Sequence, residues 1–134
     1  MNENNYQGLT SHIKRKKSSK TVCVSNVLAY IGVPLEAYQV TSTKKNVRAY
    51  QGVLRRNGFA VRSRKSSIPK NASVGKSRAS IVKIAKGDPA GTHYMVMVRG
   101  HLLLLNGKGE TIVDTDPRVR DGRKIIDIHA VWPA

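Results

Sequence analysis

The sequence predicts an α+β fold in which N-terminal helices pack on a C-terminal antiparallel β-meander. Apolar residues recur at helical spacing in the first half of the chain, whereas beyond residue 93 they form short runs separated by turn residues. The 134 residues are enough for one compact domain and too few for two of ordinary size. We therefore expect a flexible basic arm over residues 1–20 and a single domain over residues 21–134.

The first predicted helix starts almost at Cys23, and this cysteine is expected in its first turn. Val24, Val27, Leu28 and Ile31 recur at spacing i, i+3, i+4 and i+7, which places them on one buried face of the helix. Ser19 or Thr21 is suited to cap the start of the helix. Gly32 and Pro34 are typical of a helix end.

A second helix is expected from a cap at Thr43 to the stop signal Asn57–Gly58. A brief strand over 59–61 follows it. Residues 62–76 combine lysine, arginine and serine without periodicity, which predicts a basic loop. For residues 79–85 we favour a strand over a helix, because Ile81, Val82 and Ile84 are β-branched.

The C-terminal part is expected to form strands over 94–98, 102–105, 111–113 and from residue 125 onwards. Arg99–Gly100 and Asn106–Gly107 mark the first two turns. If Arg99–Gly100 is a two-residue turn, the pairing places His93 opposite Asn106. Directly paired residues point to the same face of a sheet, so the two side chains are predicted to be neighbours.

The charge is strongly basic, with 24 Lys and Arg against 8 Asp and Glu, a net charge of +16. The excess lies in residues 1–87, whose acidic residues are Glu3 and Glu36 only. Such a field favours a polyanionic partner, whether nucleic acid, an anionic membrane surface or an acidic protein, and the alternative is a merely solvated basic surface. Aromatic residues are only 5% of the chain, which disfavours base stacking. The expected nucleic-acid contacts are Lys14, Arg15, Lys16, Lys17, Lys20, Lys44, Lys45 and Arg48.

Several classes of protein are disfavoured by composition. No apolar run reaches the roughly 18 residues of a membrane span, and the polar N-terminus does not resemble a signal sequence. One cysteine cannot form an internal disulfide, and with four histidines it gives no recognisable zinc spacing. We expect neither a metal nor a cofactor, and a cytoplasmic location.

The residues suited to catalysis are Cys23 and His93. A thiol at a helix N-terminus beside positive charge has a lowered pKa and becomes a nucleophile, although a lone cysteine is often only a small buried hydrophobe. His93, at the start of an apolar strand, is the candidate base. Asn106 is the first candidate to orient its ring, with Asp114 and Asp116 in reserve. The alternative is that Asn106 only forms a turn.

The order of these motifs resembles the papain-like cysteine peptidases, including bacteriocin-leader peptidases and small phage-encoded members. The segments that carry the resemblance are Val22–Gly32, Thr92–Val98, Leu102–Asn106 and Val113–Pro117. The resemblance implies a papain-like fold, Cys23 as nucleophile, His93 as general base, and Asn106 or Asp116 as the orienting residue. It also implies a peptide or protein substrate and, for a phage protein, a location in the host cytoplasm or the virion.

Two hypotheses from different classes follow. In the first, the protein is a thiol hydrolase whose basic surface recruits a polyanion. In the second, it is a non-catalytic basic protein on a peptidase-like scaffold that binds nucleic acid or a host factor. The pKa of the Cys23 thiol separates them, because only the first hypothesis needs that pKa to lie well below its free value of about 8.5.

Overall fold

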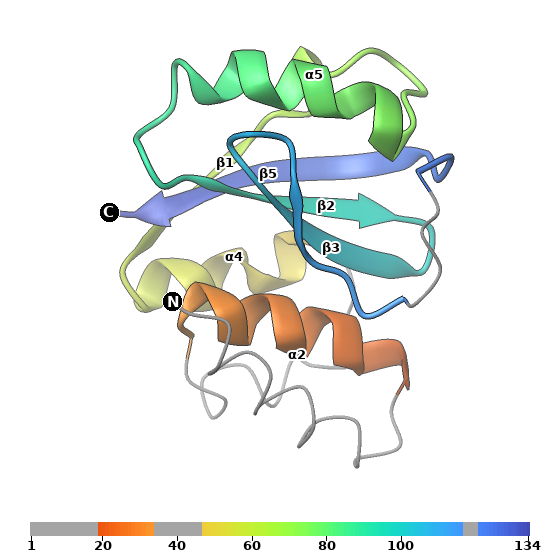
Figure 1. Cartoon of the computed structure of the whole chain (residues 1–134). Helices are drawn as coiled ribbons and strands as arrows, with labels where there is room; N and C mark the ends of the chain where they lie inside the picture. The colour runs from red at the N-terminus through yellow and green to blue at the C-terminus, as the bar shows by residue number, and fades with distance from the viewer. Residues whose placement is uncertain (1–18, 34–46, 117–120) are drawn as a thin grey trace.

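A computed structural model describes residues 19–33, 47–116 and 121–134. Three α-helices, a short 3₁₀ helix and five strands form these parts of the chain (Figure 1). The helices are α2 (Ser19–Ile31), α4 (Val47–Arg56) and α5 (Val74–Ala85), and the 3₁₀ helix η2 spans Lys65–Ser67. The strands are β1 (Phe59–Ser63), β2 (His93–Val98), β3 (His101–Asn106), β4 (Thr111–Val113) and β5 (Ile125–Pro133). The predicted α+β class is confirmed at this level.

The five strands form one antiparallel sheet in the order β1-β5-β2-β3-β4. Strands β2, β3 and β4 form the predicted meander. The last strand does not extend it, because β5 lies between β1 and β2 instead of beside β4. The expected simple C-terminal meander is therefore wrong in its last step. Strand β1, the first of the described strands, also joins the sheet, through β5.

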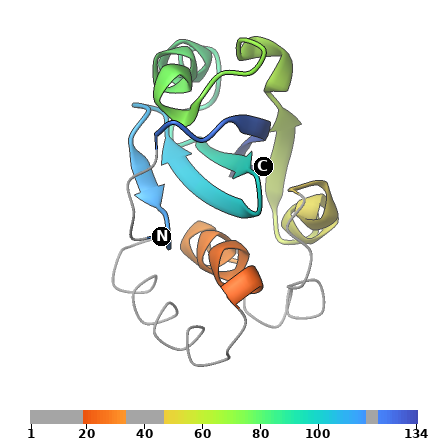
Figure 2. The same ribbon diagram turned by 90° about the vertical axis from the view of Figure 1, so that its right-hand side faces the viewer.

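Helices cover both faces of the sheet. On one face, α2 packs on β3 and β4 while α4 packs on β1 and β5 (Figures 1 and 2). The core on this face includes Val27, Leu28 and Leu54, together with Met95 and Leu104 from the strands. Helix α5 covers the opposite face (Figure 2). Alternation of side chains along β2 and β3 supplies apolar residues to both cores, which explains why these strands read as continuous apolar runs.

The prediction of a strand over residues 79–85 is wrong, because this segment is the second half of α5. The Ser73 hydroxyl accepts a hydrogen bond from the Lys76 amide and caps the N-terminus of the helix. Val74, Ser77 and Ile81 are its buried residues, at spacing i, i+3 and i+7. One buried stripe was enough to outweigh the strand preference of the β-branched residues. The predicted loop over 62–76 is accordingly shorter than expected, because its first two residues belong to β1 and its last three to α5, and it includes η2.

The other predicted elements are found. Helix α2 ends at Ile31, and the next residue, Gly32, has a φ of 110°, which suits the left-handed position after a helix. Helix α4 is followed by Gly58 with φ of 87°, as the Asn57–Gly58 stop predicts. The expected cap Thr43 and almost all of the expected arm, residues 1–18, lie outside the described residues.

Candidate functional site

The predicted pairing of His93 with Asn106 is found in the β2–β3 hairpin. Every pair in this register follows from the two-residue turn at Arg99–Gly100, from Val98 opposite His101 back to His93 opposite Asn106. On its other side His93 is paired with Val131 of β5. The imidazole therefore projects from the first residue of an interior strand, at one end of the sheet.

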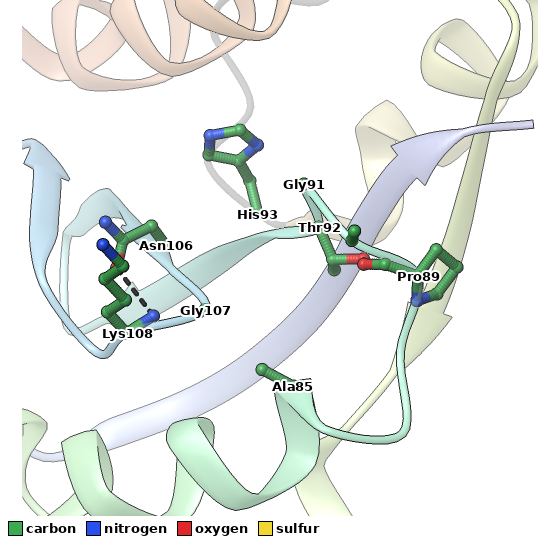
Figure 3. A pocket seen from close by; sticks show the side chains of 9 residues that line it. Ala85, Pro89, Gly91, Thr92, His93, Asn106, Gly107 and Lys108 are labelled. Atoms are coloured by element: carbon green, nitrogen blue, oxygen red, sulfur yellow. Dashed lines mark hydrogen bonds between the residues drawn. The ribbon is translucent and has the colours of Figure 1, made fainter.

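The Asn106 amide is committed to its own turn. Its Oδ1 accepts hydrogen bonds from the backbone N–H groups of Lys108 (2.9 Å) and Glu110 (3.0 Å), and its Nδ2 donates to the Glu110 carboxylate at 2.9 Å. Figure 3 shows the Asn106 side chain turned toward Lys108. These bonds favour the turn-forming role of Asn106 over the role of orienting His93.

His93 is partly buried and touches helix α2. Burial lowers the pKa of its imidazole below the ordinary value of 6.5, with an opposing contribution from a hydrogen bond to the Gly91 backbone. The ring meets that of Tyr30 edge to face, with centroids 5.8 Å apart. A cavity of about 310 Å³ lies beside this end of the sheet, lined by His93, Asn106 and the end of α5 at Ala85 (Figure 3). The lowered pKa of His93 favours the neutral imidazole, which is the form that a general base requires.

Cys23 lies deeper in its helix than predicted. It is the fifth residue of α2 and lies beyond the first turn. Only the first four amides of a helix lack an intrahelical partner, so the backbone N–H of Cys23 is bonded within the helix. That amide is therefore not free to stabilise an oxyanion. The Cys23 side chain lies outside what the structure describes.

The direction of α2 determines which part of the helix meets His93. Tyr30, near the C-terminal end, makes the contact, and Cys23 precedes Tyr30 by seven residues, about 10 Å along the helix axis. The N-terminal end of α2 lies toward the opposite end of the sheet, where β2 leads into β3 (Figures 1 and 2). The described backbone thus brings the carboxyl end of α2, rather than its amino end, to His93.

Asp114 and Asp116, the reserve candidates, belong to a different cluster. Asp114 Oδ1 lies 2.6 Å from His101 Nε2, and Asp114 Oδ2 accepts a hydrogen bond from Arg123 at 2.9 Å. Asp116 lies 3.7 Å from the same arginine. Burial alone would raise the pKa of Asp114, but the bonds from His101 and Arg123 outweigh it and hold that pKa below its usual value.

This cluster lies around the first residue of β3 and was not anticipated. The sequence contained a partial signal, since antiparallel pairing of Leu104 with Val113 brings the residues after β4 toward the start of β3. Arg123 comes from the far side of residues 117–120, which are not described, and no local pattern links it to His101. Among the described residues, Asp114 therefore orients His101 and not His93.

His129 is packed inside the fold and is not part of the cavity beside His93. It is 2% exposed on β5, and its Nε2 lies 3.1 Å from the Gln51 amide of α4. Asp127 lies 3.7 Å from its Nδ1. No group of three His, Cys, Asp or Glu suited to a metal ion occurs within the described ranges.

The charged residues of the described parts separate into two groups. Three partly buried arginines hold aspartates: Arg64 with Asp88, Arg78 with Asp121, and Arg123 with Asp114 and Asp116. The other eleven Lys and Arg side chains whose burial is described are all exposed and belong to none of the described ion pairs; they are Arg55, Arg56, Arg62, Lys65, Lys70, Lys76, Lys83, Lys86, Arg99, Lys108 and Lys124. The positive surface is thus not compensated by the acids of these parts.

The side chains of the nucleic-acid contacts expected from the sequence lie outside the part of the chain that the structure describes. Lys14, Arg15, Lys16, Lys17, Lys44 and Lys45 lie outside the described residues, and for Lys20 and Arg48 only the backbone, in α2 and α4, is described. None of the eleven exposed cations is among these expected contacts, because dense charge runs point to the segments around residues 14–20 and 44–48, whereas the exposed cations are spread over several elements.

Comparisons with known proteins find no relative: no family model, curated protein or solved structure matches the chain. Within the described residues, no helix is both long and apolar enough to span a bilayer.

Proposed function

We propose that this protein binds a polyanion, namely the phosphate backbone of a nucleic acid, through its exposed lysines and arginines. The observation that carries the proposal is the division of charge in the described parts. Each described aspartate contacts a cationic or histidine side chain of the same chain, and Glu110 is bonded to Asn106. Eleven exposed Lys and Arg side chains belong to none of the described ion pairs and are available to a partner. Phosphate contacts of this kind give sequence-tolerant, salt-sensitive affinity.

The test is the affinity of the full chain for a fluorescent DNA duplex, measured by anisotropy. Binding is expected at low salt, and it should weaken by roughly a thousandfold between 50 and 200 mM salt if six or more phosphates are contacted. Heparin should displace the DNA, whereas neutral dextran should not. Absence of binding at low salt would overturn the proposal.

A pair of variants separates charge from fold. Lys83 and Lys86 are both exposed near the end of α5. K83Q/K86Q removes two charges and is expected to lower duplex affinity and reduce the salt slope by up to about 2. K83R/K86R keeps the charge and should retain the wild-type affinity. Equal affinities for both variants would exclude this part of the surface.

A papain-like thiol hydrolase is the second candidate, and the specific observation in its favour is the partly buried imidazole of His93, whose pKa is lowered by burial and which lines a cavity at the end of the sheet. In this mechanism the Cys23 thiolate attacks a peptide carbonyl, and His93 first accepts the thiol proton and then gives it to the leaving amine. Water releases the acyl-enzyme. The contact of Tyr30 with His93 and the place of Cys23 within α2 rank this candidate below polyanion binding.

Thiol alkylation distinguishes the two candidates. Hydrolase chemistry requires an iodoacetamide rate profile that titrates well below pH 8.5, absent in Cys23→Ser and shifted upward in His93→Ala. His101→Ala is the matched control, because it removes an imidazole that pairs with Asp114 instead. A thiol that titrates at its free value in the wild-type protein would exclude the hydrolase.

A further inference from the structure

A second cavity, of about 550 Å³, lies on the part of the surface where the loop after β1 meets the start of β5. Its volume is in the range of sites that enclose small organic ligands. Three lysines line it, Lys65 from η2, Lys70 from the following loop and Lys124 from the residue before β5. None of its lining residues is acidic. The cavity is thus a concentration of positive charge with room for a ligand.

Backbone hydrogen bonds hold the segments that carry the three lysines. The Arg64 amide donates to the Ile128 carbonyl at 3.0 Å, and the Ile125 amide donates to the Ala72 carbonyl at 2.9 Å. An isolated bridge pairs Ser73 with Lys124. The lysine stems therefore start from fixed positions on two segments that are distant in sequence, which reduces the entropy lost when an anion binds between them.

Part of the cavity lining is apolar, and we call this part its floor. Ile68 and Pro69 contribute to it from the loop, and Ile126 contributes from β5. Ile126 is 49% exposed, and among the described residues the other exposed large hydrophobic side chain is Val82. A bare phosphate would use the lysines and leave this floor in water. A ligand that combines negative charge with a flat apolar body would cover both.

We propose that this cavity holds one nucleotide of a single-stranded nucleic acid. The phosphates on either side of the base contact Lys65, Lys70 and Lys124, and the base lies on Ile68, Pro69 and Ile126. Duplex DNA binds less well here, because a paired base must leave its stack before it can enter. This inference rests on the proposed binding of nucleic acid and adds the place of binding and the preference for single strands.

The test compares three probes of about twelve nucleotides, a length suited to one compact domain. They are a single strand, its duplex, and a single strand of abasic sugar-phosphate units. Wild-type protein is expected to prefer the base-bearing single strand to both others. In K65Q/K70Q/K124Q, the salt slope for the single strand should fall by about 2, and the preference should disappear.

Two further variants isolate the cavity. R56Q/R99Q/K108Q removes the same charge from exposed positions outside it and should keep the preference for the single strand. Ile126→Ser is expected to lower the affinity for the base-bearing single strand about fivefold, because only apolar contact with the base is lost. The affinity for the abasic probe should not change. As Ile126 is half exposed, this variant should fold normally.

The outcomes are distinct. If both triple variants lower the affinity for all three probes equally, nucleic-acid binding stands, but the assignment of the cavity as a nucleotide site is wrong. If Ile126→Ser affects the abasic probe as much as the base-bearing strand, the base does not lie on this floor, and the inference is likewise overturned. If wild-type protein binds none of the probes at low salt, the proposed function itself fails.

Discussion

The phenol ring of Tyr30 meets the imidazole of His93 edge to face, with the ring centroids 5.8 Å apart. This contact joins the C-terminal end of α2 to the first residue of β2 and contributes to the partial burial of His93. It is also the main structural reason for ranking polyanion binding above thiol chemistry, because the residue that meets the imidazole is Tyr30 and not Cys23.

The contact predicts how His93 titrates. Burial lowers the pKa of the imidazole, so its NMR titration should be centred below 6.5, and Tyr30→Ala should move it back toward that value by admitting water. Chemical shifts of the ring protons provide the measurement. An unchanged midpoint in the variant would show that Tyr30 does not shield the ring.

Stability should follow the same titration. The pKa of His93 is lower in the folded state than in the unfolded state, so between these two values the unfolded state binds more protons. The free energy of unfolding therefore rises with pH through this window. The contribution of His93 is lost as the pH falls below about 6.5. Urea unfolding at pH 7.5 and 5.5 measures it. His93→Gln should show a smaller loss on acidification than wild type. A larger loss in the variant would contradict the predicted direction of the pH dependence.

Asp88 is expected to be a stabilising residue. Burial alone would raise the pKa of Asp88, but hydrogen bonds from Arg64 and the Tyr94 hydroxyl outweigh it and hold that pKa below its usual value. The carboxylate therefore stabilises the fold above pH 4, and this contribution is lost as pH falls further. Asp88→Asn should lower the unfolding free energy by about 1–3 kcal/mol at pH 7.

Asp121→Asn is the matched control for Asp88. Its ion pair with Arg78 is more exposed, with 46% of the aspartate side chain accessible against 6% for Asp88. Solvent screening should limit the loss to about 0–1 kcal/mol. A loss as large as that of Asp88→Asn would show that burial does not decide the strength of these pairs.

Gly109 is expected to tolerate no side chain. Its φ is 76°, and an added Cβ would lie 2.8 Å from the Arg78 carbonyl oxygen. Gly91 has a similar φ of 84° with open space around it. Gly91→Ala should thus cost only the left-handed strain, about 1 kcal/mol, whereas Gly109→Ala should cost more. Thermal unfolding of both variants gives the comparison, and equal losses would contradict the steric part of the argument.

Local patterns predicted most of the elements, because turn chemistry and periodicity act over a few residues. The Arg99–Gly100 turn fixed the whole β2–β3 register. The β-branched content of residues 79–85 predicts a strand, but the Ser73 cap and the helical spacing of Val74, Ser77 and Ile81 make this segment a helix. The position of β5 between β1 and β2 depends on long-range packing, which no local pattern records.

The candidate site could be predicted only in part for the same reason. Pairing of His93 with Asn106 follows from one hairpin, so it was accessible from sequence. The direction of α2 across the sheet, which brings Tyr30 to His93, is set by packing between distant segments. Packing between distant segments also brings His101 and Arg123 into contact with Asp114. The catalytic roles of Cys23 and His93 stay a prediction.

The most direct test of the account is the dependence of duplex affinity on salt for the full chain, plotted as the logarithm of the association constant against that of the salt concentration. Uncompensated surface cations predict a straight line with a slope of about −3 or steeper, as expected when at least three or four phosphates release their counterions. A slope near zero, or no binding at low salt, would contradict it.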